Sequence, residues 1–205
     1  MIDKQLITGL IIAGGRGTRM GQVDKGLQNF NHIPMTLHVL KRLSPQVGKI
    51  IINANQNISE YKKFGAPVYS DRMKDFAGPL AGIQAGLSDC TTPYLLTAPC
   101  DSPMLPMNLA QALSDALISN NADIAVATSV VTEENITKEQ RHPVFSLIKL
   151  SCLESLNNFL SVGGRKVDHW LQQQLTINVM FKDSASFVNV NTMQELQLLE
   201  RKQSQ

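Results

Sequence analysis

Residues 6–25 read LITGLIIAGGRGTRMGQVDK and set the architecture of the chain. Within them, Leu6–Ala13 is a short apolar run rich in β-branched residues that ends at Gly14-Gly15. This pattern is typical of a buried strand that leads into a tight turn. Ligands of parallel sheets bind beyond the carboxyl ends of the strands. We therefore expect the functional site to begin at this turn.

The turn after this strand has the features of a phosphate-binding loop. Glycines allow the backbone to approach a ligand and to point N–H groups at phosphate oxygens, and Arg16, Arg19 and Lys25 add cationic donors. The alternative is an ordinary glycine-rich turn with solvated basic side chains. Lys25 precedes a glycine, which excludes a Walker A loop, and Met20 occupies the third glycine position of a dinucleotide fingerprint. We predict a site for a nucleoside triphosphate.

Strands and helices alternate along the chain. The predicted strands are Leu6–Ala13, Lys49–Ala54, Pro67–Ser70, Tyr94–Ala98, Ile124–Thr128, Val144–Lys149, Thr176–Met180 and Phe187–Val190. The predicted helices are Pro34–Leu43, Ser59–Phe64, Pro79–Leu87, Met107–Asn120, Ser151–Phe159, Lys166–Gln173 and Thr192–Arg201. The polar stretch Thr132–Gln140 is predicted to be an exposed loop. This alternation predicts one α/β domain over residues 1–205, a three-layer α/β/α arrangement around a mostly parallel sheet.

The composition excludes several classes of protein. An aromatic content of 5% is too low for a platform that stacks nucleic-acid bases, and a net charge of +2 gives no global attraction for polyanions. The cysteines are three in number and lack C-x-x-C spacing, which fits a reducing compartment and predicts a cytoplasmic protein. No apolar stretch approaches the roughly 18 residues of a membrane span. We expect neither nucleic acid nor a membrane as a partner.

A second signal is the turn Pro99–Pro103, directly after the predicted strand Tyr94–Ala98. It carries Asp101 between prolines that stiffen it. Mg²⁺ prefers one or two carboxylates together with phosphate oxygens and water, so Asp101 is the candidate metal ligand. The alternative is an Asx-turn, in which the carboxylate caps its own backbone.

Further polar side chains and a glycine stand at other strand ends and helix starts. Asn53 and Asp71 each follow a predicted strand and are candidates for contacts with the sugar or base of a nucleotide, although a loop amide and a turn former are the alternatives. Gly78 opens a helix, where a ligand or a packed helix would explain it equally. Asn189 and Asn191 alternate with valines and so point to one side, toward a second substrate or the water shell of the metal; Asn191 is alternatively a helix cap.

None of the four histidines has a partner at metal-ligand spacing or lies in a hydrolase motif. His142, which follows the polar stretch, is predicted to be a surface histidine. We therefore assign no catalytic histidine.

Several segments taken in order resemble the molybdenum cofactor guanylyltransferases, which belong to the pyrophosphorylase-like nucleotidyltransferases. They are Ile12–Gly15, Arg19–Gly21, Asp24-Lys25, Gly78–Gly82, Pro99–Asp101 and Phe187–Thr192. The chain departs from that pattern at Met193, where proline is usual, and at Gly17, where serine or alanine is frequent. These departures affect the stiffness of the last turn and the fine geometry of the phosphate loop.

The resemblance implies a Rossmann-like nucleotidyltransferase fold and a reaction. The terminal phosphate of molybdopterin, with or without molybdenum, attacks the α-phosphate of GTP and releases pyrophosphate. The residues implied to bind GTP are Ile12, Ala13, Gly14, Gly15, Lys25, Asn53, Asp71, Gly78 and Asp101. Asp101 is also implied to hold Mg²⁺, and Asn189 and Asn191 to face the pterin.

We expect Arg19 and Lys25 to neutralise the charge that develops during transfer, so that Arg19, Lys25 and Asp101 form the catalytic set. Molybdenum cofactor delivery proteins are a further partner class. The open alternatives are another Mg²⁺-dependent nucleotidyltransferase, making a cytidylyl or sugar-nucleotide product, and a GTP-binding regulator without catalysis.

Overall fold

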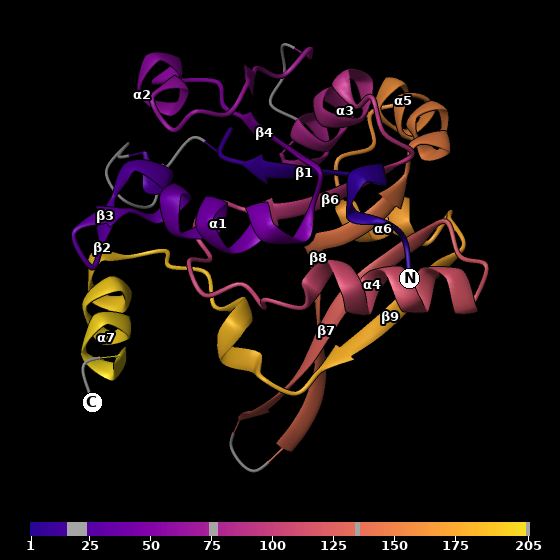
Figure 1. The fold of residues 1–205 in the computed structure, drawn as a ribbon. Helices are drawn as coiled ribbons and strands as arrows, with labels where there is room; N and C mark the ends of the chain where they lie inside the picture. The colour runs from indigo at the N-terminus through magenta and orange to yellow at the C-terminus, as the bar shows by residue number, and fades with distance from the viewer. Residues whose placement is uncertain (16–23, 74–77, 134–135, 204–205) are drawn as a thin grey trace.

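A computed structural model of the chain describes residues 1–15, 24–73, 78–133 and 136–203. Its centre is a seven-stranded sheet in the order β5-β4-β1-β6-β8-β7-β9 (Figure 1). The strands are β1 (Ile7–Ile12), β4 (Lys49–Asn53), β5 (Val68–Tyr69), β6 (Tyr94–Pro99), β7 (Ile124–Glu133), β8 (Ile136–Lys149) and β9 (Thr176–Phe181). Only β8 runs against its neighbours, so the predicted mostly parallel sheet is confirmed.

Helices cover both faces of the sheet, as the strand and helix alternation predicted. The α-helices are α1 (Met35–Leu43), α2 (Ile58–Lys62), α3 (Pro79–Asp89), α4 (Leu109–Ser119), α5 (Leu153–Ser161), α6 (Val167–Leu171) and α7 (Met193–Gln203). Short 3₁₀ turns are η1 (Lys4–Leu6), η3 (Lys25–Leu27), η4 (Ser44–Gln46), η5 (Leu150–Cys152) and η6 (Ser184–Phe187). A small antiparallel pair, β2 (Asn29–Phe30) and β3 (Ile33–Pro34), was not predicted.

Alternate side chains of β1 supply the two halves of the core. Ile7 and Ile11 face a cluster that includes buried residues of α1, α2 and α4. Leu10 faces a second cluster built with α3, α5 and α6. This distribution follows from the period-2 geometry of a strand that is buried on both faces.

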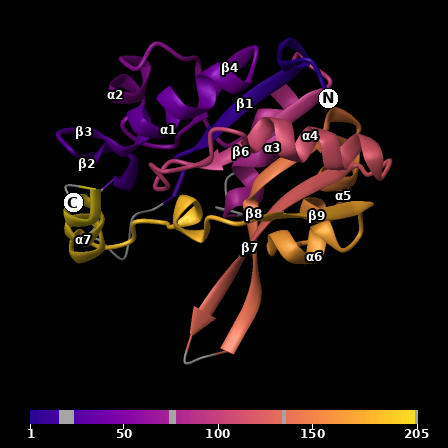
Figure 2. The same cartoon turned by 60° about the horizontal axis from the view of Figure 1, so that its bottom comes forward.

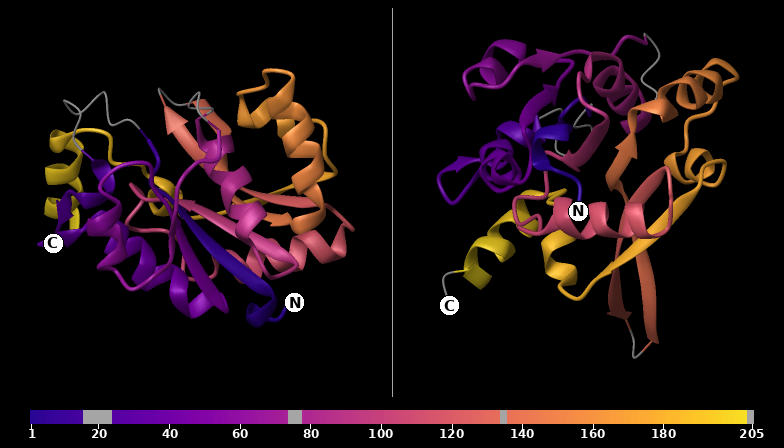
Figure 3. Two further views of the ribbon diagram at one scale, coloured as in Figure 1. Left: turned by 90° about the horizontal axis from the view of Figure 1, so that it is seen from above. Right: turned by 45° about the vertical axis from the view of Figure 1, so that its right-hand side comes forward.

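The C-terminal helix α7 lies beside β2 and β3, at the end of the molecule formed by the N-terminal part of the chain (Figure 3). A small apolar cluster joins them, in which Val190 and Leu196 pack with Phe30 and Met35. The last residues of the sequence are therefore folded back toward the first βα unit.

Two sequence predictions about elements are wrong. In the stretch predicted as a loop, Thr132–Glu133 ends β7 and Ile136–Gln140 begins β8, and these strands continue as a two-stranded hairpin away from the body of the sheet (Figure 2). Residues 137–140 are all exposed, so they show no apolar alternation that would reveal a strand. Phe187–Val190 is no strand either: Phe187 ends η6, and Phe187 and Val190 are buried in separate clusters instead of in a sheet, while Val188 is exposed.

No helix in the described part of the chain is long and apolar enough to span a membrane.

Parallel pairing aligns the carboxyl ends of four strands at one edge of the sheet. Ile12 of β1 is opposite Asn53 of β4 on one side and Pro99 of β6 on the other, and Asn53 is opposite Tyr69 of β5. The segments that follow these strands are consequently neighbours, although they are far apart in sequence.

The second half of the core depends on Trp170, whose side chain is fully buried and whose indole Nε1 lies 3.3 Å from Ser155 Oγ. We expect Trp170→Ala to lower the free energy of unfolding by about 3–5 kcal/mol, because it leaves a large cavity between α6 and the sheet. Urea unfolding followed by circular dichroism measures this. Val162→Ala, at a side chain that is 83% exposed, is the control and should change stability by less than about 0.5 kcal/mol. Equal stabilities of the two variants would contradict this view of the core.

Candidate active site

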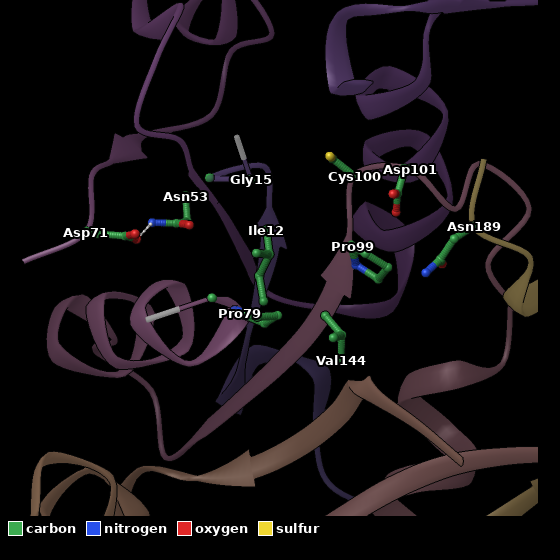
Figure 4. A pocket seen from close by; sticks show the side chains of 12 residues that line it. Ile12, Gly15, Asn53, Asp71, Pro79, Pro99, Cys100, Asp101, Val144 and Asn189 are labelled. Atoms are coloured by element: carbon green, nitrogen blue, oxygen red, sulfur yellow. Dashed lines mark hydrogen bonds between the residues drawn. The ribbon is translucent and has the colours of Figure 1, made fainter. Parts of the chain in front are cut away.

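A cavity of about 400 Å³ opens at the edge where the parallel strands end (Figure 4). Its walls come from the turns after β1, β4, β5 and β6 and from the start of α3. The lining residues are Ile12, Gly14, Gly15, Asn53, Asp71, Gly78, Pro79, Pro99, Cys100, Asp101, Val144 and Asn189. The cavity therefore gathers most of the residues that the sequence singled out.

The remaining predicted residues lie differently. Lys25 donates to Asp101 at the cavity wall and to Asn191, so Asn191 is connected to the cavity through Lys25. Ala13 is buried beneath it, and its N–H donates to the carbonyl of Asn53 at 2.8 Å. Arg19 lies outside the described residues.

One wall is a charged cluster around Asp101, on the turn after β6. The Asp101 side chain is 14% exposed, and its Oδ2 is 3.4 Å from Lys25 Nζ. Lys25 Nζ also donates to Asn191 Oδ1 at 2.7 Å. Burial is the larger effect on the pKa of the Asp101 carboxyl and raises it. The Lys25 ammonium offsets part of this increase. The carboxylate is thus buried but directed into the cavity, where a cation would offset its loss of hydration (Figure 4).

The C-terminal segment is held against this turn. Val190 N donates to the carbonyl of Asp101 at 2.8 Å, and Ser102 Oγ donates to Asn189 Oδ1 at 2.5 Å. Glu195, in the first turn of α7, accepts the backbone N–H of Asn191 at 2.6 Å. These contacts place both asparagines beside Asp101, on the side of the cavity away from β4.

The opposite wall is a network of amides around Asp71. Asn53 Nδ2 donates to Asp71 Oδ1 at 2.9 Å, and Asn55 Nδ2 donates to Asp71 Oδ2 at 2.7 Å. The backbone N–H of Asp71 donates in return to Asn55 Oδ1 at 2.9 Å. Sequence reasoning missed Asn55. Its spacing from Asn53, two residues along the end of a strand, puts both side chains on one side and was the available signal.

Asn53 requires glycines around it. It is 1% exposed, and its Oδ1 is a buried atom without a hydrogen-bond partner among the described residues. A Cβ at Gly14 would lie 2.8 Å from this oxygen, and one at Gly82 only 2.5 Å. Gly82 is therefore explained by the close approach of α3 to the site. Gly78, at φ +63°, adopts a left-handed backbone conformation that favours glycine at the start of this helix.

A buried carboxylate anchors the turn that carries Lys25. Asp24 is 8% exposed and accepts hydrogen bonds from the Tyr61 hydroxyl at 2.6 Å and from Asn57 Nδ2 at 3.0 Å. Burial raises the pKa of Tyr61 far above its usual range, so the hydroxyl stays a donor. Thr36 Oγ1 donates to the carbonyl of Gly26 at 2.9 Å. Sequence reasoning missed this anchor because α2 and the Lys25 turn meet only in the fold.

His142, predicted to be a surface histidine, is partly exposed and packs against its neighbours on one side. Its ring stacks on Phe187 with centroids 4.5 Å apart, and its Nε2 is 2.8 Å from Ser129 Oγ. Burial lowers its pKa. His142 thus supports the segment that leads to Asn189.

The residues around Asp101 suit a cation that takes most of its ligands from phosphate oxygens and water. Among the described residues, no group of three or more His, Cys, Asp or Glu side chains could hold a metal ion. Asp101 offers a single carboxylate at the cavity wall. A site with one protein carboxylate fits Mg²⁺ completed by phosphate oxygens and water.

Comparison with known proteins agrees with this geometry. Residues 9–177 match the family model described as the MobA-like NTP transferase domain. Among solved structures, molybdopterin-guanine dinucleotide biosynthesis protein A from Archaeoglobus fulgidus has a TM-score of 0.76 at 20% identity and covers 96% of this chain and 98% of its own. A 4-diphosphocytidyl-2C-methyl-D-erythritol synthase from Anaerococcus prevotii reaches 0.75 at 10% identity, covering 99% of this chain and all of its own, which shows a shared fold.

Curated relatives are much more similar in sequence. A molybdenum cofactor guanylyltransferase from Ralstonia nicotianae is 54% identical over 204 residues, covering 98% of this chain and 100% of its own. One from Cupriavidus necator is 50% identical and covers 96% of this chain and 97% of its own. The chain therefore belongs to the MobA-like NTP transferase family and, within it, to the molybdenum cofactor guanylyltransferases.

Proposed function

We propose that this protein transfers GMP from GTP to the terminal phosphate of molybdopterin, giving the guanine dinucleotide form of the cofactor and pyrophosphate. The observation that carries the proposal is one cavity with a cation and a carboxylate at one end, Lys25 and Asp101, and a fixed polar network at the other, around Asn53 and Asp71. The membership of the chain among guanylyltransferases supports the choice of substrates.

The cavity suits an extended nucleotide that lies across the ends of the strands. The glycine turn after β1 is central, so it suits the phosphates, which backbone N–H groups and Lys25 would bind. Asn53 and Asp71 follow β4 and β5, on the side away from Asp101. They are therefore placed for the nucleoside.

Transfer on this arrangement needs orientation and neutralisation of charge more than proton transfer. An oxygen of the acceptor phosphate attacks the α-phosphorus of GTP, and the bond from that phosphorus to the oxygen bridging to the β-phosphate breaks. The acceptor phosphate is already anionic at neutral pH, so no general base is required. Lys25 stabilises the charge on the leaving pyrophosphate, and we propose the same for Arg19. Asn189, whose amide nitrogen points toward the cavity (Figure 4), is placed for the acceptor.

Nucleotidyltransferases of this kind typically use a divalent metal, and we propose Mg²⁺ held by Asp101. When bound, the ion would add Lewis-acid stabilisation of phosphate charge. Lys25 bonds the carboxylate and would orient it, and Asn191 in turn holds the Lys25 ammonium. Molybdopterin is the proposed acceptor, and molybdenum cofactor delivery proteins stay a predicted partner class.

The nucleotide choice is tested by pyrophosphate release with GTP, ATP, CTP and UTP in the presence of Mg²⁺ and molybdopterin. We expect GTP to give at least tenfold more product than each of the others, and mass analysis to find the guanine dinucleotide. Faster release with CTP would replace the proposal by a cytidylyltransferase. GTP binding without release of pyrophosphate would show that the protein is a GTP-binding regulator and not the proposed enzyme.

Asp101→Asn removes the carboxylate charge and keeps the shape of the side chain. We expect turnover to fall by roughly 10²- to 10³-fold, as for loss of one preorganised charge contact, with an unchanged circular dichroism spectrum. Asp115→Asn, at an exposed carboxylate on α4, is the matched control. Wild-type turnover of Asp101→Asn at ordinary Mg²⁺ would remove Asp101 from the mechanism.

Lys25→Ala removes the ammonium that lies between Asp101 and Asn191. We expect a loss of turnover of similar size, roughly 10²- to 10³-fold, because the charge of the leaving pyrophosphate loses a fixed partner. Single-turnover measurement at saturating GTP separates this loss from weaker binding. Lys41→Ala, at an exposed position of α1, serves as the control. An effect confined to the affinity for GTP would show that Lys25 binds the nucleotide without aiding transfer.

A further inference from the structure

Asn55 connects three segments of the cavity wall. Its Nδ2 donates to Asp71 Oδ2 at 2.7 Å and to the carbonyl of Gly14 at 3.1 Å, and its Oδ1 accepts the backbone N–H of Asp71 at 2.9 Å. One side chain thus links the end of β4, the end of β5 and the glycine turn after β1. It does so without lining the cavity itself.

The hydrogens of this network are fully used. An asparagine amide nitrogen carries two hydrogens. Those of Asn53 have acceptors in Asp71 Oδ1 and the carbonyl of Tyr69, and those of Asn55 in Asp71 Oδ2 and the carbonyl of Gly14. The remaining capacity that a ligand can reach is that of an acceptor, the second lone pair on each carboxylate oxygen of Asp71. This wall therefore favours a ligand group that presents N–H or O–H donors.

Asp71 lies at the far end of the cavity from Asp101. It follows the edge strand β5, and β4 and β1 separate that strand from β6, which leads to Asp101. Three strand spacings amount to roughly 14 Å. In an extended nucleotide the base is the part most distant from the phosphates, so the base belongs beside Asp71.

Guanine is the base whose edge matches a carboxylate held in this way. Its N1–H and N2–H₂ are adjacent donors, and they fit the two oxygens of one carboxylate in a bidentate pair. Adenine and cytosine place an acceptor nitrogen beside a single amino group, and uracil has one N–H between two carbonyls. Each of these would bring an acceptor against an acceptor.

We propose that Asn55 is a positioning residue for guanine selection: it fixes the Asp71 carboxylate so that both oxygens face the N1–H and N2–H₂ edge of the base. This inference rests on the proposed use of GTP and adds how the base is chosen. The bond from Asn55 to the Gly14 carbonyl also ties the base end of the site to the phosphate turn.

The test measures binding by titration calorimetry, with Mg²⁺ and without acceptor. The probes are GTP, inosine triphosphate, which lacks the N2 amino group, and 2′-deoxyGTP. We expect the wild-type protein to bind GTP at least about tenfold more tightly than inosine triphosphate, as for one hydrogen bond to a charged group. In Asn55→Ala this ratio should fall to about two, with the preference over 2′-deoxyGTP unchanged. Asn178→Ala, at an exposed position on β9, should keep the wild-type ratio.

A pair of exchanged side chains separates positioning from a structural role. Asn55→Asp places a second carboxylate against Asp71 and should lower the melting temperature. Adding Asp71→Asn restores a donor and an acceptor between the two positions, so the melting temperature should recover in part; the hydrogen bond to the Gly14 carbonyl stays lost. The preference for GTP over inosine triphosphate should not recover, because position 71 no longer carries a carboxylate. Recovery of both would show that Asn55 acts only on stability.

Other results have distinct meanings. If Asn55→Ala keeps the wild-type preference for GTP over inosine triphosphate, the proposal is overturned. It is also overturned if Asn55→Ala loses only its discrimination against 2′-deoxyGTP, because that result would place the ribose at Asp71. A wild-type protein that binds GTP and inosine triphosphate equally also overturns it. A wild-type protein that prefers GTP but transfers no GMP would refute the proposed function and leave the role of Asn55 supported.

Discussion

The parallel pairing of β1 with β4 on one side and with β6 on the other brings the functional side chains together. Strands that run in the same direction end at the same edge, and their registers set Ile12 opposite both Asn53 and Pro99. The segments after these strands can then meet within hydrogen-bonding distance. A shift of β4 by one residue would turn Asn53 to the other face of the sheet, and the amide network around Asp71 could not form.

Polar groups are buried at the edge of the sheet where the parallel strands end. Two of them, the carboxylates of Asp24 and Asp101, have partners that offset the cost of their burial. The Asp24 carboxylate is held by a tyrosine hydroxyl and an amide, and Asp101 by an ammonium. Desolvation of an unpaired carboxylate would be far more unfavourable than these contacts are favourable. Among the described residues, Asn53 Oδ1 and Gln56 Nε2 are buried near this edge without a hydrogen-bond partner. Such atoms are unfavourable for stability.

The shared fold leaves the choice of substrate open, since proteins with cytidylyl chemistry in their names have the same architecture at low identity. We propose that in this chain the choice lies in a few side chains at the ends of four strands. The amide network around Asp71 and the charged cluster around Asp101 occupy opposite ends of one cavity. Their separation, set by the order of the strands, matches the separation of base and phosphates in a nucleotide.

The local pattern of residues was enough to predict the alternation of strands and helices, the glycine turn, and the functional interest of Asn53, Asp71 and Asp101. Each of these depends on neighbours a few residues away, through strand periodicity, turn chemistry and the position of a polar residue at a strand end. The sheet order was predicted only as a class, mostly parallel, because pairing depends on contacts that no local pattern encodes.

Tertiary structure decided which of these residues touch. Lys25 and Asn191 are 166 positions apart and share a hydrogen bond only because α7 folds back to the first βα unit. Asn55, Tyr61 and the packing of His142 went unrecognised for the same reason, since their partners come from other elements. The β7–β8 hairpin was missed because its exposed residues 137–140 show no apolar alternation, so its stability comes from cross-strand pairing that appears only when the two strands lie side by side.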